Sequence, residues 1–243
     1  NPLGTLLRLV RVEYCLLGAA GVIAGAMVDG MRAPTALLTS TAAAVFFVAA
    51  GCYAFDDYFD LYVDLANGRT DRPLVTGNRK RSSVALTGSV CFVLALVAAA
   101  VAGLAVLAIV AAGSAAALVY NRWLQRAFPI KNLLLAGAFP APLLLGGLAS
   151  GQDVTPALGW CAAVAYGAGI GFEVMIDIAD VEGDRANGAD TLSTRYGPGP
   201  AARVAGMAFA LATALLLAPF VLPIDPRLTG DSLYLLAASA AAA

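Results

Sequence analysis

Residues Ser82–Asn121 read SSVALTGSVCFVLALVAAAVAGLAVLAIVAAGSAAALVYN, forty residues that contain no Asp, Glu, Lys or Arg. A helix that crosses a membrane needs about 20 apolar residues, so this run is long enough for two crossings. Gly103 lies near its middle and suits a turn, because glycine has no side chain to restrict the backbone. We therefore predict a hairpin of two membrane-spanning helices that turns near Gly103.

The whole chain has the composition of an integral membrane protein. Of its 243 residues 60% are hydrophobic and only 13% are charged, whereas about 25% are charged in soluble domains. The remaining apolar runs are Val12–Val28 (interrupted by Glu13), Ala33–Phe55, Asn132–Gln152, Val154–Phe172, Val204–Ile224 and Ser232–Ala243. With the hairpin they predict an all-α bundle of eight spans around a central cavity, the last span cut short at Ala243. The chain is expected to form a single integral-membrane domain.

Two clusters of aspartates follow long apolar runs and share one spacing. They are Asp57, Asp60 and Asp64 in FDDYFDLYVD, and Asp177, Asp180 and Asp184 in DIADVEGD. The spacing i, i+3, i+7 places three carboxylates on one face of a helix. A lone aspartate at the end of a span is usually a solvated interfacial residue, but six at one repeated spacing indicate a shared site.

The basic residues predict which side of the membrane carries the two clusters. Of the 15 Lys and Arg, 13 lie before the first span or in the loops that follow spans two, four and six. Positively charged loops stay on the cytoplasmic side, so the N-terminus and both clusters are predicted to be cytoplasmic. A span that ends in aspartates and is followed by a basic loop occurs twice, which indicates two similar four-helix halves.

Carboxylates brought this close together need a cation. Two unit charges 4 Å apart repel by about 4 kcal/mol at an effective dielectric constant of 20. Mg²⁺ takes carboxylate and phosphate oxygens as ligands, and Mn²⁺ or Ca²⁺ would use the same ones. Zinc is disfavoured because the chain has no histidine, and its four cysteines lie within apolar runs as small buried hydrophobic residues.

Basic side chains beside bound Mg²⁺ favour an anionic substrate such as a diphosphate. Arginine donates paired hydrogen bonds to phosphate oxygens, and the metal neutralises charge on a leaving diphosphate. The candidates are Arg69, Arg72, Arg122, Arg126, Lys131, Arg185 and Arg195. The formal net charge of −1 gives no reason to expect nucleic acid as a partner.

Two stretches resemble the signatures of the UbiA superfamily of intramembrane prenyltransferases. Residues 56–77, DDYFDLYVDLANGRTDRPLVTG, are similar to its NDxxDxxxD motif and the loop that follows, and residues 177–197, DIADVEGDRANGADTLSTRYG, are similar to its DxxDxxGD motif. Asp56 stands where the family usually has Asn. The family typically has nine spans, one more than this chain shows.

The resemblance implies transfer of a prenyl group from a prenyl diphosphate to an acceptor, with Mg²⁺ held between the motifs. It assigns metal and diphosphate binding to Asp56, Asp57, Asp60, Asp64, Asp177, Asp180 and Asp184. Asp60, Asp180 and Arg126 are the residues expected to carry catalysis. Aromatic rings that would shield the allylic cation are Tyr53, Phe55, Tyr58, Phe59 and Phe172, because ring faces attract cations.

The acceptor is predicted from the second motif. Its DVEGDRANGADTL block resembles the archaeal lipid branch of the family, the digeranylgeranylglyceryl phosphate synthases, and also the chlorophyll synthase and homogentisate branches. The lipid branch, whose acceptor is a prenylated glycerol phosphate such as geranylgeranylglyceryl phosphate, is favoured because the acceptor phosphate would use the surplus of basic residues. An aromatic acceptor such as 4-hydroxybenzoate is the alternative within the enzyme class. Outside it, the alternatives are a cation or solute transporter, since acidic residues in spans also mark ion pathways, and a non-catalytic scaffold.

Overall fold

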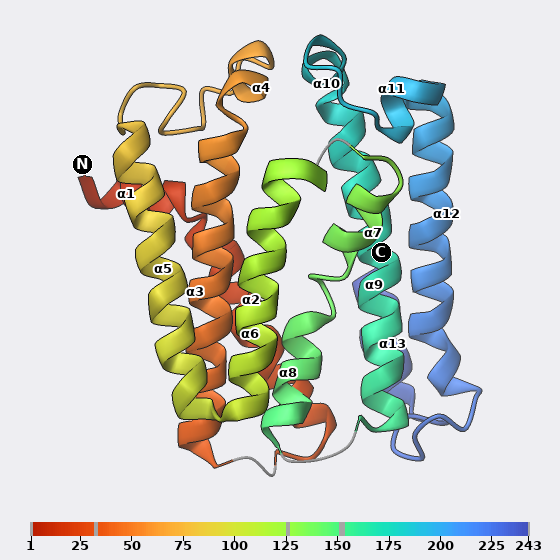
Figure 1. Ribbon diagram of the computed structural model, residues 1–243. Helices are drawn as coiled ribbons and strands as arrows, with labels where there is room; N and C mark the ends of the chain where they lie inside the picture. The colour runs from red at the N-terminus through yellow and green to blue at the C-terminus, as the bar shows by residue number, and fades with distance from the viewer. Residues whose placement is uncertain (1, 32–33, 125–126, 151–153, 243) are drawn as a thin grey trace.

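The computed structural model describes residues 2–31, 34–124, 127–150 and 154–242, and within these ranges the only regular elements are helices. They form an upright bundle in which the long helices run roughly parallel or antiparallel (Figure 1). The α-helices are α1 (Pro2–Leu9), α2 (Val12–Val28), α3 (Thr35–Phe59), α4 (Leu61–Ala66), α5 (Arg81–Ala102), α6 (Leu104–Val119), α7 (Ile130–Ala136), α8 (Ala141–Ala149), α9 (Pro156–Ala179), α10 (Val181–Ala186), α11 (Leu192–Tyr196), α12 (Pro198–Leu217) and α13 (Ser232–Ala242).

The predicted hairpin is confirmed. Helices α5 and α6 pack against each other and are joined by Gly103 alone. Gly103 adopts φ 122° and ψ 168°, a backbone conformation that residues with a Cβ rarely adopt. Glycine at this position therefore permits the abrupt reversal of the chain. The charge-free run of sequence therefore folds into two antiparallel helices.

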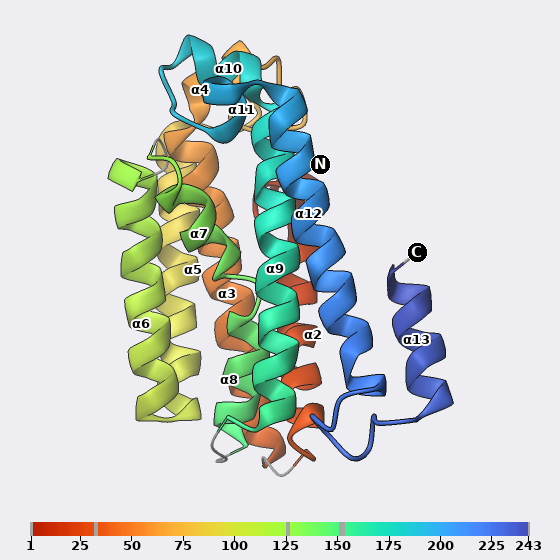
Figure 2. The same cartoon turned by 90° about the vertical axis from the view of Figure 1, so that its right-hand side faces the viewer.

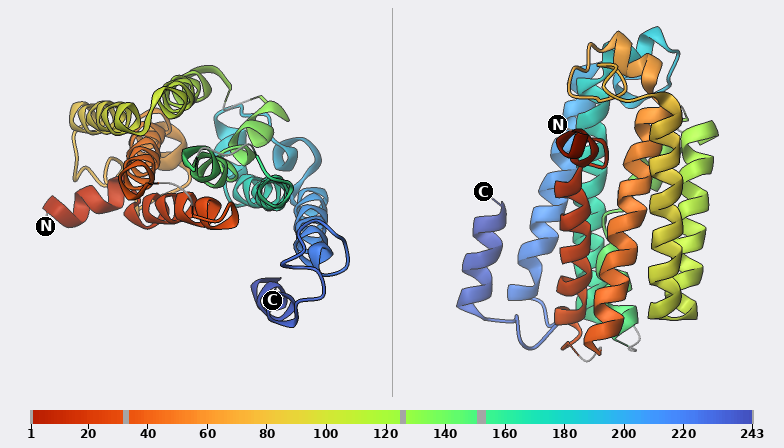
Figure 3. Two further views of the ribbon diagram at one scale, coloured as in Figure 1. Left: turned by 90° about the horizontal axis from the view of Figure 1, so that it is seen from below. Right: turned by 90° about the vertical axis from the view of Figure 1, so that its left-hand side faces the viewer.

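The predicted number of eight spans is not confirmed. Among the described residues, six helical segments are long and apolar enough to cross a membrane, and the bent pair α1–α2 raises the number to seven if it is counted as one span. Helix α13 is a shorter apolar helix that packs against α12 at the edge of the bundle (Figure 3). The chain is thus a multi-pass membrane protein.

Several spans are less regular than the sequence predicts. The run expected from Asn132 to Gln152 is divided into α7 and α8, with a break that ends at Pro140, which has no amide hydrogen to donate to a preceding turn. Helix α6 continues into a π-helical turn, Tyr120–Leu124. Conversely, α3 and α9 extend beyond Phe55 and Phe172, because a helix does not have to end at its first acidic residue.

Small residues allow the helices to approach closely. The largest buried cluster contains many alanines, and α2 crosses α8 where Gly25 faces Leu143 and Gly146 faces Val22. A Cβ added at either glycine would lie 2.0 Å from a backbone carbonyl oxygen of the facing helix. Membrane helices are held together largely by such close packing, because lipid tails are as apolar as the side chains.

We expect Gly146→Ala to destabilise the protein. The new methyl group must push α8 away from α2, and overpacking of this kind costs about 1–3 kcal/mol. Gly206→Ala in α12 is the matched control, because a Cβ at that position meets no atom within 4 Å and alanine favours a helix over glycine. Thermal unfolding in detergent measures both variants, and equal melting temperatures would contradict the packing argument.

Candidate functional site

The two aspartate clusters lie at the same end of the bundle. Helices α4 and α10, which follow the two long helices α3 and α9, contact each other at the top of the molecule (Figures 1 and 2). The Arg69 guanidinium in the loop after α4 lies 3.4 Å from Asp180 Oδ1, so the loop of the first cluster reaches an aspartate of the second. The two clusters therefore meet at one end of the bundle, as a shared site requires, and the cytoplasmic location of that end stays a prediction.

The spacing of the aspartates predicted that each cluster lies on one face of a continuous helix. The structure instead breaks the helix at the middle aspartate of each cluster. Helix α3 ends at Phe59, Asp60 adopts φ −89° and ψ 6°, and α4 begins one residue later. Asp180 has the same role between α9 and α10, with φ −99° and ψ 11°. Each motif therefore has one aspartate on a spanning helix, a second at the break, and a third on a short helix that turns away.

The first aspartate of the first motif is held by two arginines. Asp57 is 2% exposed, and its Oδ1 accepts hydrogen bonds from Arg11 at 3.0 Å and from Arg72 at 3.2 Å. Arg72 also lies 3.7 Å from Asp64 Oδ2, so one guanidinium links two aspartates of the motif. These contacts bring the predicted residue Arg72 into the site.

Arg11 is a site residue that the sequence analysis missed. It lies at the break between α1 and α2, adopts a left-handed conformation with φ 47°, and its guanidinium lies 4.5 Å from the centre of the Tyr53 ring. Its charge contributed to the orientation argument, but no motif distinguishes it from other basic residues near a span. The Tyr53 ring that was predicted to face an allylic cation faces this arginine here.

The first aspartate of the second motif has different partners. Asp177 is fully buried, and its two oxygens accept hydrogen bonds from Lys131 at 2.5 Å and from Asn132 at 2.7 Å. Both partners belong to α7, which the break in that span places beside α9. Glu173, one helical turn from Asp177 and also buried, interacts electrostatically with Lys131 and with Asp56 across the bundle.

Asp56 faces the π-helical turn at the end of α6. Its side chain forms a hydrogen bond with Asn121, which is buried at this turn. Single turns of π-helix occur often at functional sites, because they displace a side chain from its regular position. Neither Asn121 nor Glu173 belongs to the two motifs, so the spacing argument could not find them.

The other predicted basic residues that the structure describes lie at its surface. Arg122 and Arg185 are exposed, and Arg195 donates a hydrogen bond to Asp190 at 3.0 Å. Arg126 lies outside the described residues, and its role stays a prediction.

The predicted aromatic residues pack among themselves and with other side chains. Tyr58 has the guanidinium of Arg81 4.4 Å from its ring centre, and Phe172 lies 5.6 Å from Phe139, centre to centre. Phe55 stacks on Phe92 of α5 at 5.4 Å. Their contact with a substrate cation remains a prediction.

The third aspartates have the chemistry of a site for a hard cation. Burial is the main cause that raises the pKa of Asp64 to about 6, and the Asp180 carboxylate raises it further. Burial likewise raises the pKa of Asp184 to about 6, with contributions from Asp177 and Asp180. Asp184 Oδ2 is buried and accepts no hydrogen bond from any residue in the described ranges.

The carboxylate oxygens of Asp64 and Asp184 are the kind of ligand that a divalent cation takes, but the acidic side chains in the described ranges are not gathered around one point. Among the residues that the structure describes, no three acidic or cysteine side chains converge to form a ready metal site. Asp57 and Asp177 are instead occupied by basic partners. Asp64, Asp180 and Asp184 are less deeply buried than these two, although Asp64 and Asp180 also have arginine neighbours, at 3.7 Å and 3.4 Å.

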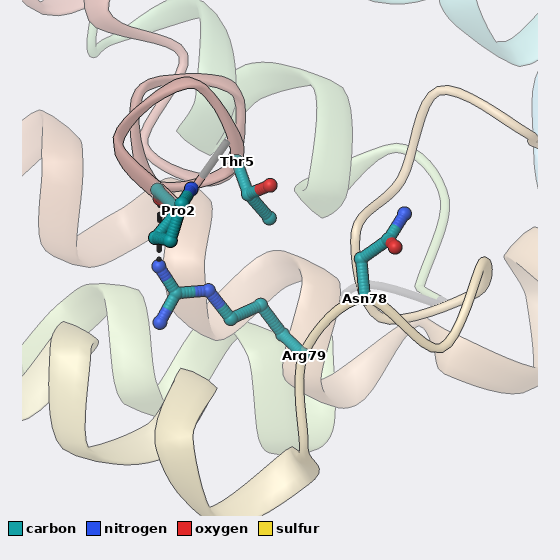
Figure 4. A pocket seen from close by; sticks show the side chains of 4 residues that line it. All are labelled: Pro2, Thr5, Asn78 and Arg79. Atoms are coloured by element: carbon teal, nitrogen blue, oxygen red, sulfur yellow. Dashed lines mark hydrogen bonds between the residues drawn. The ribbon is translucent and has the colours of Figure 1, made fainter.

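A surface pocket lies apart from the motif aspartates, between α1 and the loop that leads into α5. It is lined by Pro2, Thr5, Asn78 and Arg79, and Arg79 donates a hydrogen bond across it to the Pro2 carbonyl at 3.1 Å (Figure 4). None of these residues was predicted to bind substrate, so this pocket is not the predicted central cavity. The central cavity stays a prediction.

We expect Lys131→Met to lower the free energy of unfolding by about 3–5 kcal/mol, because it leaves the buried Asp177 carboxylate without its cation. The double variant Lys131→Met/Asp177→Asn removes both charges and should be more stable than the single variant. Unfolding in detergent measures the difference. A double variant less stable than Lys131→Met would show that the ion pair is not the source of the effect.

Comparison with known proteins places these features in context. The sequence profile of the UbiA prenyltransferase family matches residues 16–243. Digeranylgeranylglyceryl phosphate synthase from Methanopyrus kandleri is 36% identical over 211 residues, which cover 86% of this chain and 76% of that protein. A solved structure reported for digeranylgeranylglyceryl phosphate synthase in membranes is 25% identical, with a TM-score of 0.72 over 98% of this chain and 87% of that one. A UbiA homologue from Archaeoglobus fulgidus, solved with GPP and Mg²⁺, is 18% identical, with a TM-score of 0.75 over 98% and 86%.

Proposed function

Since the chain belongs to the UbiA prenyltransferase family, we propose that it transfers a prenyl group from a polyprenyl diphosphate to a prenylated glycerol phosphate with the help of Mg²⁺. The class of enzyme follows from the family, and the acceptor and the metal are the proposed parts. The acceptor is supported by the relatives named digeranylgeranylglyceryl phosphate synthase. The donor and the metal are supported by the homologue that was solved with GPP and Mg²⁺.

The meeting of the two motifs at one end of the bundle is the observation that carries this proposal. Arg69 of the first motif's loop contacts Asp180 of the second motif, and α4 packs against α10. A diphosphate has two phosphoryl groups and several charged oxygens, so a site for it needs ligands from more than one segment. Two aspartate motifs from two spans, with basic residues between them, supply such ligands.

Asp60, Asp64, Asp180 and Asp184 are the residues that would hold the metal. Mg²⁺ bound there would neutralise the negative charge that develops on the departing diphosphate. Arg69, which is 32% exposed, donates to Asp71 as well as to Asp180, and it would turn from Asp71 to bind phosphate oxygens. Asp57 and Asp177 have a different task, because they hold Arg72 and Lys131 close to the site.

The placement of the site also suits a substrate with a charged head and a long apolar tail. The aspartates and their basic partners lie at one end of the long helices, whereas residues 35–55 and 156–172 carry no charge. The diphosphate would bind at the polar end, and its prenyl chain would extend along the apolar spans. We propose that this polar end faces the cytoplasm, from the distribution of basic residues between the loops.

We expect Asp60→Ala and Asp180→Ala to abolish transfer while the proteins remain folded, because each removes a carboxylate at the break between a long and a short helix. Chelation of divalent metal should have the same effect. Asp231→Asn, which lies before α13 and outside both motifs, is the control that should keep full activity. Normal turnover in either alanine variant would remove the metal assignment.

The acceptor is identified by testing two chemical classes separately. The purified protein, Mg²⁺ and geranylgeranyl diphosphate are incubated with geranylgeranylglyceryl phosphate and, separately, with 4-hydroxybenzoate, and products are identified by mass. We expect a product only with the glycerol phosphate. Prenylated 4-hydroxybenzoate as the main product would instead establish the aromatic alternative.

A further inference from the structure

Asn67 joins the two motifs directly. It is the residue that ends α4, and its side chain reaches α10. Its Oδ1 accepts a hydrogen bond from the Gly183 amide at 2.8 Å, and its Nδ2 donates one to Asp180 Oδ1 at 3.4 Å. One amide side chain thus contacts both the backbone of α10 and the carboxylate that precedes it.

The second motif contains the equivalent asparagine, which does something different. The sequences DLANG (64–68) and DRANG (184–188) occupy the same place after the two motifs, and Asn67 and Asn187 end their short helices in the same way. Asn187 Nδ2, however, donates to the Gly183 carbonyl of its own helix at 2.8 Å. The crossing contact of Asn67 is therefore not a general property of an asparagine that ends a helix.

Gly183 is shaped to receive Asn67. It is buried, and a Cβ at this position would lie 2.3 Å from both polar atoms of the Asn67 side chain. Any larger residue would force the asparagine out. Gly183 immediately precedes Asp184 within α10, so the same contact also holds the backbone beside the third aspartate.

We propose that Asn67 is a positioning residue that holds Asp180 and Asp184 of the second motif in the arrangement needed to bind a divalent cation together with a diphosphate. The inference rests on the proposed function for the identity of that ligand. Asn67 and Arg69 both donate to Asp180 Oδ1, so the orientation of this carboxylate is determined by the opposite half of the molecule. Partners that orient a metal-binding carboxylate typically change metal affinity or activity 10–100-fold when they are removed.

The first test compares Asn67→Ala with Asn187→Ala. Mg²⁺-dependent binding of inorganic pyrophosphate is measured by calorimetry on the detergent-purified protein, together with the Mg²⁺ concentration that gives half-maximal prenyl transfer and the melting temperature. We expect Asn67→Ala to weaken pyrophosphate binding and to raise the required Mg²⁺ concentration by about tenfold or more. Asn187→Ala should leave both values unchanged. Equal losses of pyrophosphate binding in the two variants would overturn the proposal, since removal of the residue that ends a short helix would then explain both.

The second test examines whether Asn67 and Gly183 act through one contact. Gly183→Ala should displace Asn67 and cause a similar rise in the Mg²⁺ requirement. In the double variant Asn67→Ala/Gly183→Ala the new methyl group meets no asparagine, so its effect should equal that of Asn67→Ala alone. If the rise in Mg²⁺ requirement of the double variant equalled the product of the two single rises, the proposal would be overturned. Wild-type protein that binds neither pyrophosphate nor a prenyl diphosphate with Mg²⁺ would refute the proposed function itself, whereas normal binding by Asn67→Ala would refute only the role of Asn67.

Discussion

The structure depends on pairing the negative charge of carboxylates buried at the ends of spanning helices with positively charged side chains. Asp57 and Asp177 are almost completely removed from solvent, and an unpaired charge in such a place costs several kcal/mol. Each has its cation supplied by an irregular part of the chain. Arg11 comes from the break between α1 and α2, and Lys131 from the first turn of a span that breaks after α7. The two helix breaks thus bring Arg11 and Lys131 to the buried aspartates, which continuous helices would not do.

The two halves share a backbone plan but not a set of contacts. In both, a long helix ends at an aspartate, a short helix follows, and an Asn-Gly pair ends it, with Gly68 and Gly188 at φ 63° and 67°. The partners of the buried aspartates differ, because one half supplies two guanidinium groups and the other an ammonium and an amide. A diphosphate between the halves would therefore meet two chemically different surfaces, which favours a single direction of binding.

Sequence predicted the parts of this structure that depend on local pattern. The charge-free run fixed the hairpin at Gly103, and the repeated aspartate spacing identified two segments that do meet. The breaks at Asp60 and Asp180 were missed, because a spacing compatible with a helix does not require that the helix continue. The pairing of Lys131 with Asp177 was missed for another reason: which cation meets which carboxylate is decided by packing between distant spans.

The distribution of charge also separates the enzyme from the transporter that was its alternative. A cation pathway places ionisable groups near the middle of the bilayer, where the transported ion must leave water. Here the long helices α3 and α9 carry no charge over residues 35–55 and 156–172, and their acidic groups gather at one end beside arginine and lysine. Basic partners next to these carboxylates would attract the phosphates of a substrate. The same apolar helices that would obstruct an ion offer a favourable surface to a prenyl chain, as the proposed binding of the donor's head at one end and its tail along the bundle requires.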